Sequence, residues 1–140
     1  MIEWLLLERL VISAVLGGLI GTEREMHDKP AGFRTHVLVC MGAAMFTLIS
    51  ISIAETAASS VDISRIAAGV VTGIGFLAAG SIFREKDRVK GLTTAADIWV
   101  LAAIGMSVGL GYYFLSVVAT VIALVILIVG RVLDHFLDRK

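Results

Sequence analysis

The stretch GLTTAADIWVLAAIGMSVGLGYYFLSVVATVIALVILIVG, residues 91–130, decides the fold because its 40 residues contain one charged side chain, Asp97. A single straight helix of this length would be about 60 Å long, whereas the hydrocarbon core of a bilayer is about 30 Å thick. The chain therefore has to turn within the stretch. The segment Gly109-Leu110-Gly111 permits a tight turn, and the two tyrosines that follow it suit a membrane interface.

Three more apolar stretches precede this one, so the sequence predicts an all-α bundle of five transmembrane helices. With 58% hydrophobic residues and a mean hydropathy of +0.94, the chain has more apolar surface than a soluble domain of its size can bury. We therefore interpret residues 1–140 as one membrane domain. The predicted spans are 4–22, 37–54, 66–83, 92–108 and 112–130.

Basic residues alternate between the gaps that separate these spans. Ten of the twelve Lys and Arg residues lie in the first gap, the third gap and the C-terminal tail, while Arg9 and Arg65 lie on the other side. Cytoplasmic loops retain Lys and Arg, so the pattern predicts an N-terminus outside and a C-terminus in the cytoplasm. Arg9 is expected to snorkel at the outer rim.

Glycine is unusually frequent, with fourteen residues against one proline, and many glycines fall inside predicted spans. Small residues four apart on one helix face allow close backbone approach within lipid. We therefore expect the first and third spans to form the centre of the bundle, and a homo-oligomer, with a dimer favoured, to form through such faces. The predicted packing glycines are Gly17, Gly21, Gly69, Gly73, Gly75 and Gly80.

An internal repeat is also predicted. A shift of 59 residues aligns seven identities in the 37 pairs from Leu10 to Phe46. The first two spans would then correspond to the third and fourth in the same orientation, as in transporters with parallel repeats.

Four strings carry most of the polar residues: GTERE from Gly21, AGFRTH from Ala31, GIGFLAAG from Gly73 and GLTTAADIW from Gly91. Under the predicted topology their polar side chains converge on the cytoplasmic rim of the bundle. This rim is the one candidate site that the sequence offers, and its predicted members are Glu25, Arg34, Thr35, His36, Arg84, Thr93, Thr94 and Asp97.

These strings resemble the membrane domain of the MgtC/SapB family over almost the whole chain. The resemblance implies a multi-pass protein of the bacterial cytoplasmic membrane, associated with growth in low magnesium and, in pathogens, with survival inside macrophages. It also implies action on other membrane proteins, ATP synthase among them. Longer members continue into a soluble cytoplasmic domain, so this chain is expected to be a short form. Ala78 replaces a common glycine, and packing there is expected to differ.

Thr35 and Thr94 lie where the second and fourth spans begin. Their hydroxyls could cap free backbone N–H groups, which is the reading we favour. The positive dipole ends of these helices, with Arg34 beside them, could alternatively hold an anion or an acidic group of a partner.

Asp97 lies about one turn inside its span, where an ionised carboxylate is costly unless it is paired or hydrated. The expected partners are Arg34, His36 and Arg84. We favour a structural ion pair or hydrogen-bond network over a direct role in ion or proton movement.

No catalytic or metal site emerges from the sequence. Glu23, Glu25 and Asp28 offer oxygen ligands for Mg²⁺, but the interleaved basic residues favour rim salt bridges instead. His36 has no nearby His or Cys with which to form a zinc site, and Cys40 is expected to pack in the core. No nucleotide-binding or hydrolase motif is present, so no cofactor is predicted, and a net charge of zero predicts no nucleic-acid partner.

Three functions remain open at this stage. The favoured one is a non-enzymatic membrane regulator that modulates partner membrane proteins under magnesium limitation or related stress. The rival is a transporter or channel for a small ion or solute. The third is an assembly subunit whose rim motifs only stabilise the fold.

Overall fold

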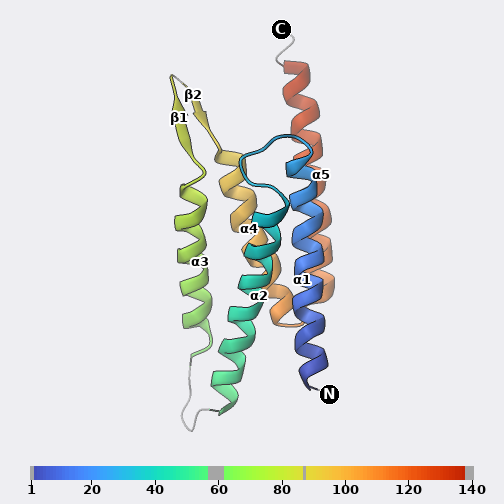
Figure 1. The fold of residues 1–140 in the computed structure, drawn as a ribbon, viewed down its shortest axis with the longest axis vertical. Coiled ribbons are helices and arrows are strands. Elements are labelled where there is room, and N and C mark those ends of the chain that lie inside the picture. The colour runs from blue at the N-terminus through green and yellow to red at the C-terminus, as the bar shows by residue number, and fades with distance from the viewer. Residues whose placement is uncertain (1, 57–61, 87, 138–140) are drawn as a thin grey trace.

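The computed structural model describes residues 2–56, 62–86 and 88–137. Five helices run along its long axis, and a short two-stranded hairpin joins the third helix to the fourth (Figure 1). Four of the helices, all except α3, are long and apolar enough to cross a membrane. The elements are α1 Ile2–Glu25, α2 Phe33–Thr56, α3 Ser64–Ala79, β1 Phe83–Glu85, β2 Arg88–Lys90, α4 Leu92–Gly109 and α5 Tyr113–Leu137.

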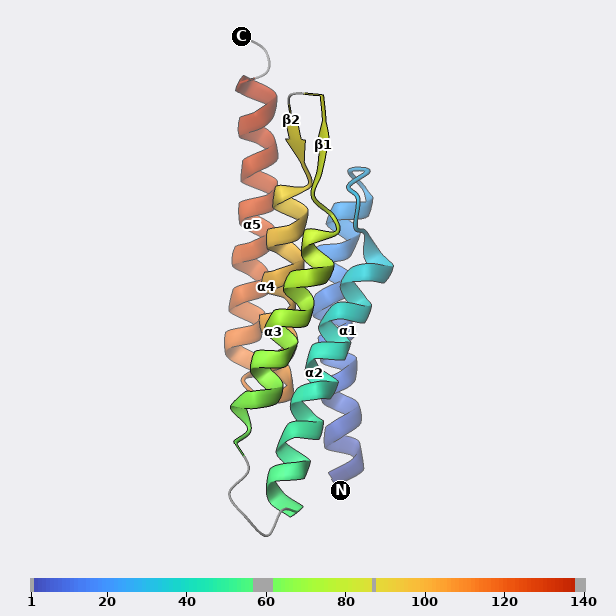
Figure 2. The same cartoon turned by 90° about the vertical axis from the view of Figure 1, so that its left-hand side faces the viewer.

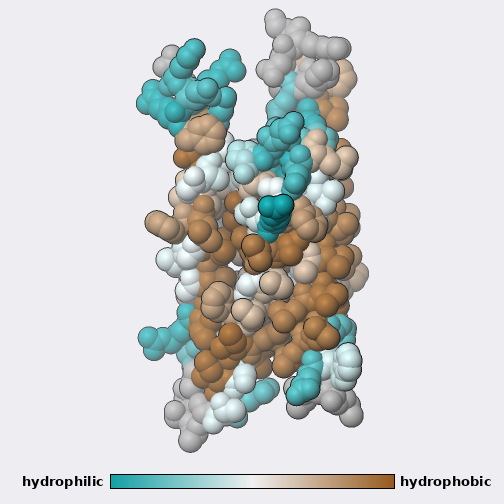
Figure 3. Space-filling view, viewed as in Figure 1, coloured by the Kyte–Doolittle hydropathy of each residue, from teal (hydrophilic) through white to brown (hydrophobic). Residues whose placement is uncertain are grey.

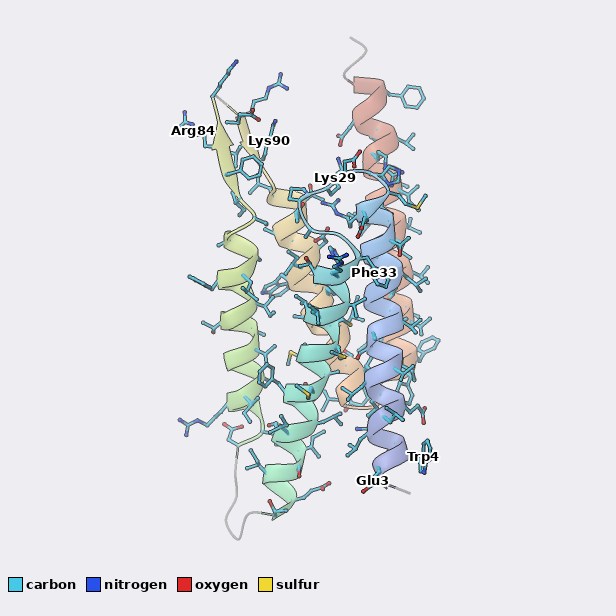
Figure 4. The ribbon with its side chains drawn as sticks, in the orientation of Figure 1. Glu3, Trp4, Lys29, Phe33, Arg84 and Lys90 are labelled. Atoms are coloured by element: carbon cyan, nitrogen blue, oxygen red, sulfur yellow. The ribbon has the colours of Figure 1, made fainter. Side chains whose placement is uncertain are left out.

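The connections divide between the two ends of the bundle. The loop after α1, the hairpin and the end of α5 lie at one end, which we call the basic end (Figures 1 and 2). Lys29, Arg84 and Lys90 lie there, whereas Glu3 and Trp4 lie at the opposite end (Figure 4). The two basic gaps and the end of α5 therefore share one end of the molecule. The side of the membrane that this end faces stays a prediction.

Apolar side chains form the outer surface of the middle of the bundle. Figure 3 shows a brown central region with teal side chains toward both ends. Val15, Leu38 and Ile126, from three different helices, are each more than half exposed. An exposed apolar belt between two polar ends is suited to a bilayer rather than to water.

The third helix is shorter than the apolar stretch predicted. Its 16 residues end at Ala79 rather than at Phe83, and they span about 24 Å. Ser81 follows, and its Oγ donates a hydrogen bond to the Ala78 carbonyl at 2.7 Å. Phe83 instead pairs with Lys90 in the antiparallel hairpin. The prediction of a helical span through Phe83 was therefore wrong, because strand pairing takes over the last apolar residues.

Gly91 is essential to the return from the hairpin into α4. Its φ of +87° lies in the left-handed region, and a Cβ there would lie 1.9 Å from the Ser81 carbonyl oxygen. Only glycine fits this position without a shift of the backbone.

Helix α4 is the centre of the bundle, since it packs against each of the other four helices. Its residues Leu101, Ile104 and Val108 form the main core with Cys40 of α2 and two side chains of α1, Leu16 and Ile20. This corrects the expectation that the first and third spans are central. Helix α3 lies at the edge, and Ala78 is its one buried residue among those described.

Glycines set the distance at which α1 and α4 approach α2. A Cβ at Gly17 would lie 2.7 Å from the His36 carbonyl oxygen, and one at Gly105 would lie 2.1 Å from the Cys40 carbonyl oxygen. Gly21 of α1 and Gly109 of α4 make similarly close contacts with α2. The sequence pointed to the two α1 glycines as packing residues but missed those of α4.

The predicted packing glycines of α3 make no such contacts. At Gly69, Gly73 and Gly75 an added Cβ would meet nothing within 4 Å in the described part of the chain, and at Gly80 it would meet only atoms of the preceding turn. Spacing identifies small residues but does not show which face has a neighbour. Packing of these glycines against a second chain, like the internal repeat, stays a prediction.

The predicted turn in the distal stretch is confirmed. Helix α4 ends at Gly109, α5 begins at Tyr113, and Gly111 between them has a φ of +84°. The partly exposed Arg9 lies beside this turn, where its Nη1 donates a hydrogen bond to the Gly109 carbonyl at 2.7 Å. A cation at a helix C-terminus satisfies a free carbonyl and complements the helix dipole.

We predict that Gly105→Ala lowers the free energy of unfolding by about 1–3 kcal/mol, because the methyl group would overlap the α2 backbone. The matched change Gly73→Ala should be neutral or stabilising by up to about 1 kcal/mol, since the helix gains propensity in open space. Unfolding of both variants in one detergent provides the measurement. Equal effects of the two substitutions would contradict this account of α4.

Candidate functional site

The basic end begins where α1 passes into α2 through a tight loop. A carboxylate oxygen of Glu25 accepts a hydrogen bond from the Phe33 backbone N–H at 2.6 Å. This places a negative charge at the start of α2, where the helix dipole favours it. A Cβ at Gly32 would lie 2.6 Å from the same carboxylate, so glycine leaves the room that Glu25 occupies.

The centre of the site is a buried ion pair between α1 and α4. Arg24, in the last turn of α1, places its Nε 2.8 Å from Asp97 Oδ2, and the two side chains are 5% and 6% exposed. Arg24 Nη2 also donates a hydrogen bond to Thr94 Oγ1 at 2.6 Å. Thr94 and Asp97 are three apart on α4, so one guanidinium reaches both.

The Arg24–Asp97 contact is held by charge rather than by an aligned hydrogen bond. Arg24 Nε and both Asp97 oxygens make no hydrogen bond within the described residues, although the ion-pair distance is short. Each charge is nevertheless neutralised by the other. Loss of either partner would leave an uncompensated charge in a nearly dry environment, which is much costlier than loss of an exposed pair.

His36 completes the cluster from α2. Its ring is fully buried, with Nε2 3.5 Å from Asp97 Oδ1 and Nδ1 2.8 Å from the Gly32 carbonyl oxygen. A carbonyl can only accept, so Nδ1 carries a proton and donates. A hydrogen bond from Nε2 to Asp97 would therefore require the doubly protonated ring. We call Arg24, His36, Thr94 and Asp97 the buried polar cluster.

The structure places the eight sequence-predicted site residues in three settings. His36, Thr94 and Asp97 come together in the buried polar cluster, and Glu25 caps α2. The other four, which do not join the cluster, lie on the surface: Arg34, Thr35, Arg84 and Thr93.

Two of the expected partners of Asp97 are therefore replaced by one that was not expected. His36 lies beside Asp97 as predicted, but Arg34 and Arg84 are exposed, and Arg84 Nε donates to the Lys86 carbonyl at 3.1 Å. Arg24 could have been identified as a buried residue from its position three residues after Gly21. This spacing puts both residues on the α1 face that packs against α2 and α4.

Thr94 does not cap its own helix. Gly91 occupies the N-cap position of α4 and no side chain caps it, while the Thr94 hydroxyl accepts from Arg24 instead. The favoured capping role for Thr94 was therefore wrong, and the hydroxyl serves contact between helices.

A second polar contact joins α1 to α5 at the same end. Glu23 forms an ion pair with Arg131, whose Nη1 also donates to His27 Nε2 at 2.6 Å. His27 Nδ1 lies 2.6 Å from the Glu23 carbonyl oxygen. Glu23 thus takes part in a rim salt bridge, as the sequence indicated, although its partner comes from the far end of the chain. Within the described residues, no group of three or more His, Cys, Asp or Glu is placed to hold a metal ion.

A recess of about 840 Å³ lies beside these contacts, between the hairpin, the start of α4 and α5. Part of its wall is apolar and part is charged. We call this recess the rim recess. Its lining includes Arg24, Lys29, Phe83, Val89, Lys90, Leu92, Ile126, Leu127, Arg131 and Asp134.

Comparison with known proteins assigns the chain to a family. The model of the MgtC family matches residues 10–136. The chain belongs to the MgtC family. It is 48% identical over 136 residues to the Escherichia coli K12 protein named "Putative magnesium transporter YhiD", covering 94% of this chain and 63% of that protein. No solved structure gives a significant match.

Two further relatives come from other bacteria. Protein MgtC of Salmonella typhimurium 14028s is 45% identical over 115 residues, covering 82% of this chain and 48% of that protein. An uncharacterized protein of Haemophilus influenzae is 39% identical over 142 residues, covering 97% of this chain and 60% of its own length. The chain thus spans about half to two thirds of the length of these relatives.

We predict that Arg24→Gln and Asp97→Asn each lower the free energy of unfolding by about 3–5 kcal/mol, because each leaves one buried charge without its partner. The double variant should lose clearly less than the sum of the two. Denaturant unfolding of the four proteins in detergent gives the coupling energy. Arg34→Gln, an exposed control, should change stability by less than about 0.5 kcal/mol. Additivity of the two cluster substitutions would contradict the pairing.

Proposed function

We propose that this MgtC-family chain is a non-enzymatic regulator in the bacterial cytoplasmic membrane. It acts by contact with other membrane proteins during adaptation to low magnesium or to intracellular stress. The family resemblance names ATP synthase as one partner class, and a second copy of the chain is another. The observation that carries the proposal is the neutralised state of Asp97.

An ion path needs polar groups that are free to coordinate, and Asp97 is not free. Its charge is opposed by Arg24 from within the same cluster, and His36 occupies its other side. Mg²⁺ favours carboxylates and retained waters, and a fixed guanidinium at 2.8 Å opposes a divalent cation there. The buried polar cluster is thus better suited to tie three helices together than to pass magnesium.

Buried hydroxyls deeper in the bundle do not extend the cluster into a polar path. Ser13, Thr47 and Thr120 each donate to a carbonyl of their own helix three or four residues earlier, and Ser116 donates to the Tyr112 carbonyl just before α5. Such bonds satisfy the donor of each hydroxyl locally. Two buried hydroxyls differ, since Ser50 donates to the Ile63 carbonyl and Tyr113 has no partner within the described residues. The locally satisfied hydroxyls favour a sealed bundle over a transporter.

The outer surface offers room for a partner helix. An apolar groove of about 810 Å³ runs between α2 and α3, lined by Gly42, Gly69 and Gly73 among other small and aliphatic residues. An added Cβ at any of these three glycines would meet nothing within 4 Å in the described residues. Small residues on an exposed face are what helix association in lipid requires. The groove supports the proposed contact with a membrane-spanning partner.

Magnesium transport is the second candidate, favoured by the name of the Escherichia coli relative and by an acidic residue inside a span. One experiment separates the candidates. In vesicles loaded with a magnesium-sensitive dye, the purified chain should admit Mg²⁺ no faster than empty vesicles. Flux that rises with the amount of chain in the vesicles would overturn the regulator.

We predict that Gly69→Leu with Gly73→Leu lowers association in the membrane at least fivefold, because the two side chains fill the groove. Gly75→Leu is the matched control, since it also adds bulk in open space on α3 but does not line the groove. Resonance energy transfer between two labelled populations of the chain, and co-purification with ATP synthase, would report the change. Unaltered association in the double variant would remove the groove from the proposal.

A further inference from the structure

We propose that the rim recess binds the phosphate group of an anionic phospholipid from the adjacent leaflet. This assignment is independent of whether the chain acts as a regulator. It depends on the depth of the recess in the membrane, on the positions of apolar and charged side chains along its walls, and on its charge.

The level of the recess follows from the lengths of the helices beside it. Helices α3 and α4 have 16 and 18 residues, or about 24 and 27 Å, which is less than the roughly 30 Å of hydrocarbon. Helices α1 and α2 have 24 residues each, or about 36 Å. We therefore place the start of the hairpin, which joins the two short helices, close to the hydrocarbon boundary. Its unpaired backbone edges require polar surroundings, which the head-group layer supplies.

The lining changes from apolar to charged along α5, where Ile126 and Leu127 are followed by Arg131 one turn later. The opposite wall carries both kinds of side chain, with Lys90 among the apolar Phe83, Val89 and Leu92. A phospholipid has the same order, with acyl chains below and the phosphate above. An inorganic anion would make no use of the apolar part.

Basic side chains exceed acidic ones around the recess. The recess lining itself carries four Lys and Arg against the three acids Glu23, Asp28 and Asp134. Outside the lining, the hairpin adds Arg84, Lys86 and Arg88 against Glu85 in the described residues, and Asp87 is a further acid by sequence. Arg24 and Arg131 are committed to ion pairs with Asp97 and Glu23. The Lys90–Glu85 pair is more than half exposed, and such pairs are weak and readily exchanged. Lys29 and Lys90 are thus the cations best placed to meet a phosphate.

The start of α4 adds a further attraction. Its N-cap is Gly91, without a side-chain cap, and the first intrahelical bond runs from the Ala95 N–H to the Gly91 carbonyl. The helix dipole at this point favours an anion. The converging cations, the amphipathic wall and the helix start point to one ligand chemistry, a phosphodiester with acyl chains attached.

The test is a titration of the delipidated full chain in detergent with phosphatidylglycerol, phosphatidylcholine or inorganic phosphate, with bound molecules counted by native mass spectrometry. Phosphatidylglycerol should bind more tightly than phosphatidylcholine. Lys29→Gln with Lys90→Gln should weaken its binding roughly twenty-five-fold, at about fivefold for each basic residue near a charged lipid surface. Arg65→Gln, a basic residue at the opposite end, should change binding by less than twofold.

Each other outcome would overturn the assignment. Equal binding of the two lipids, or unchanged phosphatidylglycerol binding in the double variant, would show that the recess does not select the phosphate. Competition by inorganic phosphate at matched affinity would show an anion site that does not require a lipid. Circular dichroism and the melting temperature monitor folding. If the double variant lost helix, Lys29→Glu alone, in the loop after α1, would repeat the test, and unchanged binding would reject the proposal.

Discussion

The close approach of α1 and α4 to α2 is the constraint on which the rest of the structure depends. Gly17 and Gly105 bring helix backbones to within a distance that no Cβ would tolerate. In lipid, where apolar side chains gain little from leaving their surroundings, such backbone contact is a principal source of helix association. It also fixes the relative height of the three helices. Arg24 at the end of α1 meets Asp97 near the start of α4 only because both helices are held at that height.

The buried polar cluster is best understood as a consequence of this packing. A buried ion pair is seldom a net source of stability, since desolvation offsets much of the attraction. What it does supply is specificity. A slide of α1 along α2 by one residue would separate Arg24 from both Thr94 and Asp97 and leave charges unpaired. The cluster therefore penalises alternative registers of three largely apolar helices, whose hydrophobic surfaces alone would distinguish them poorly.

Much of this architecture could be predicted from the sequence, because hydrophobic length and charge alternation act over whole segments. The five helices, the turn at Gly109–Gly111 and the meeting of His36, Thr94 and Asp97 at one end all follow from such patterns. The details that failed depend on which face of a helix has a neighbour. Arg24 looked like one of several interleaved rim charges, although it is the buried partner of Asp97.

The edge of the bundle was harder to predict for the same reason. The residues Ile82 and Phe83 are as apolar as the helix before them, so hydropathy could not show that they leave α3. The end of α3 is set by strand pairing with residues 88–90 and by the left-handed backbone at Gly91. Both features lie later in the sequence than the helix that they end. Likewise, the α3 glycines share the spacing of Gly17 and Gly21 but lie on open faces.

These contrasts divide the molecule into two parts with different physical character. Helices α1, α2 and α4 share close backbone contacts and a neutralised charge cluster, so they form the closely packed part of the molecule. Helix α3 has a single buried residue, Ala78, among those described and contacts the rest mainly through α4. Gly69 and Gly73 of this helix make no close contact with another helix of the described chain, and both line the groove. A partner helix in that groove would pack between α2 and α3 and gain the close contact that the chain alone leaves unmade.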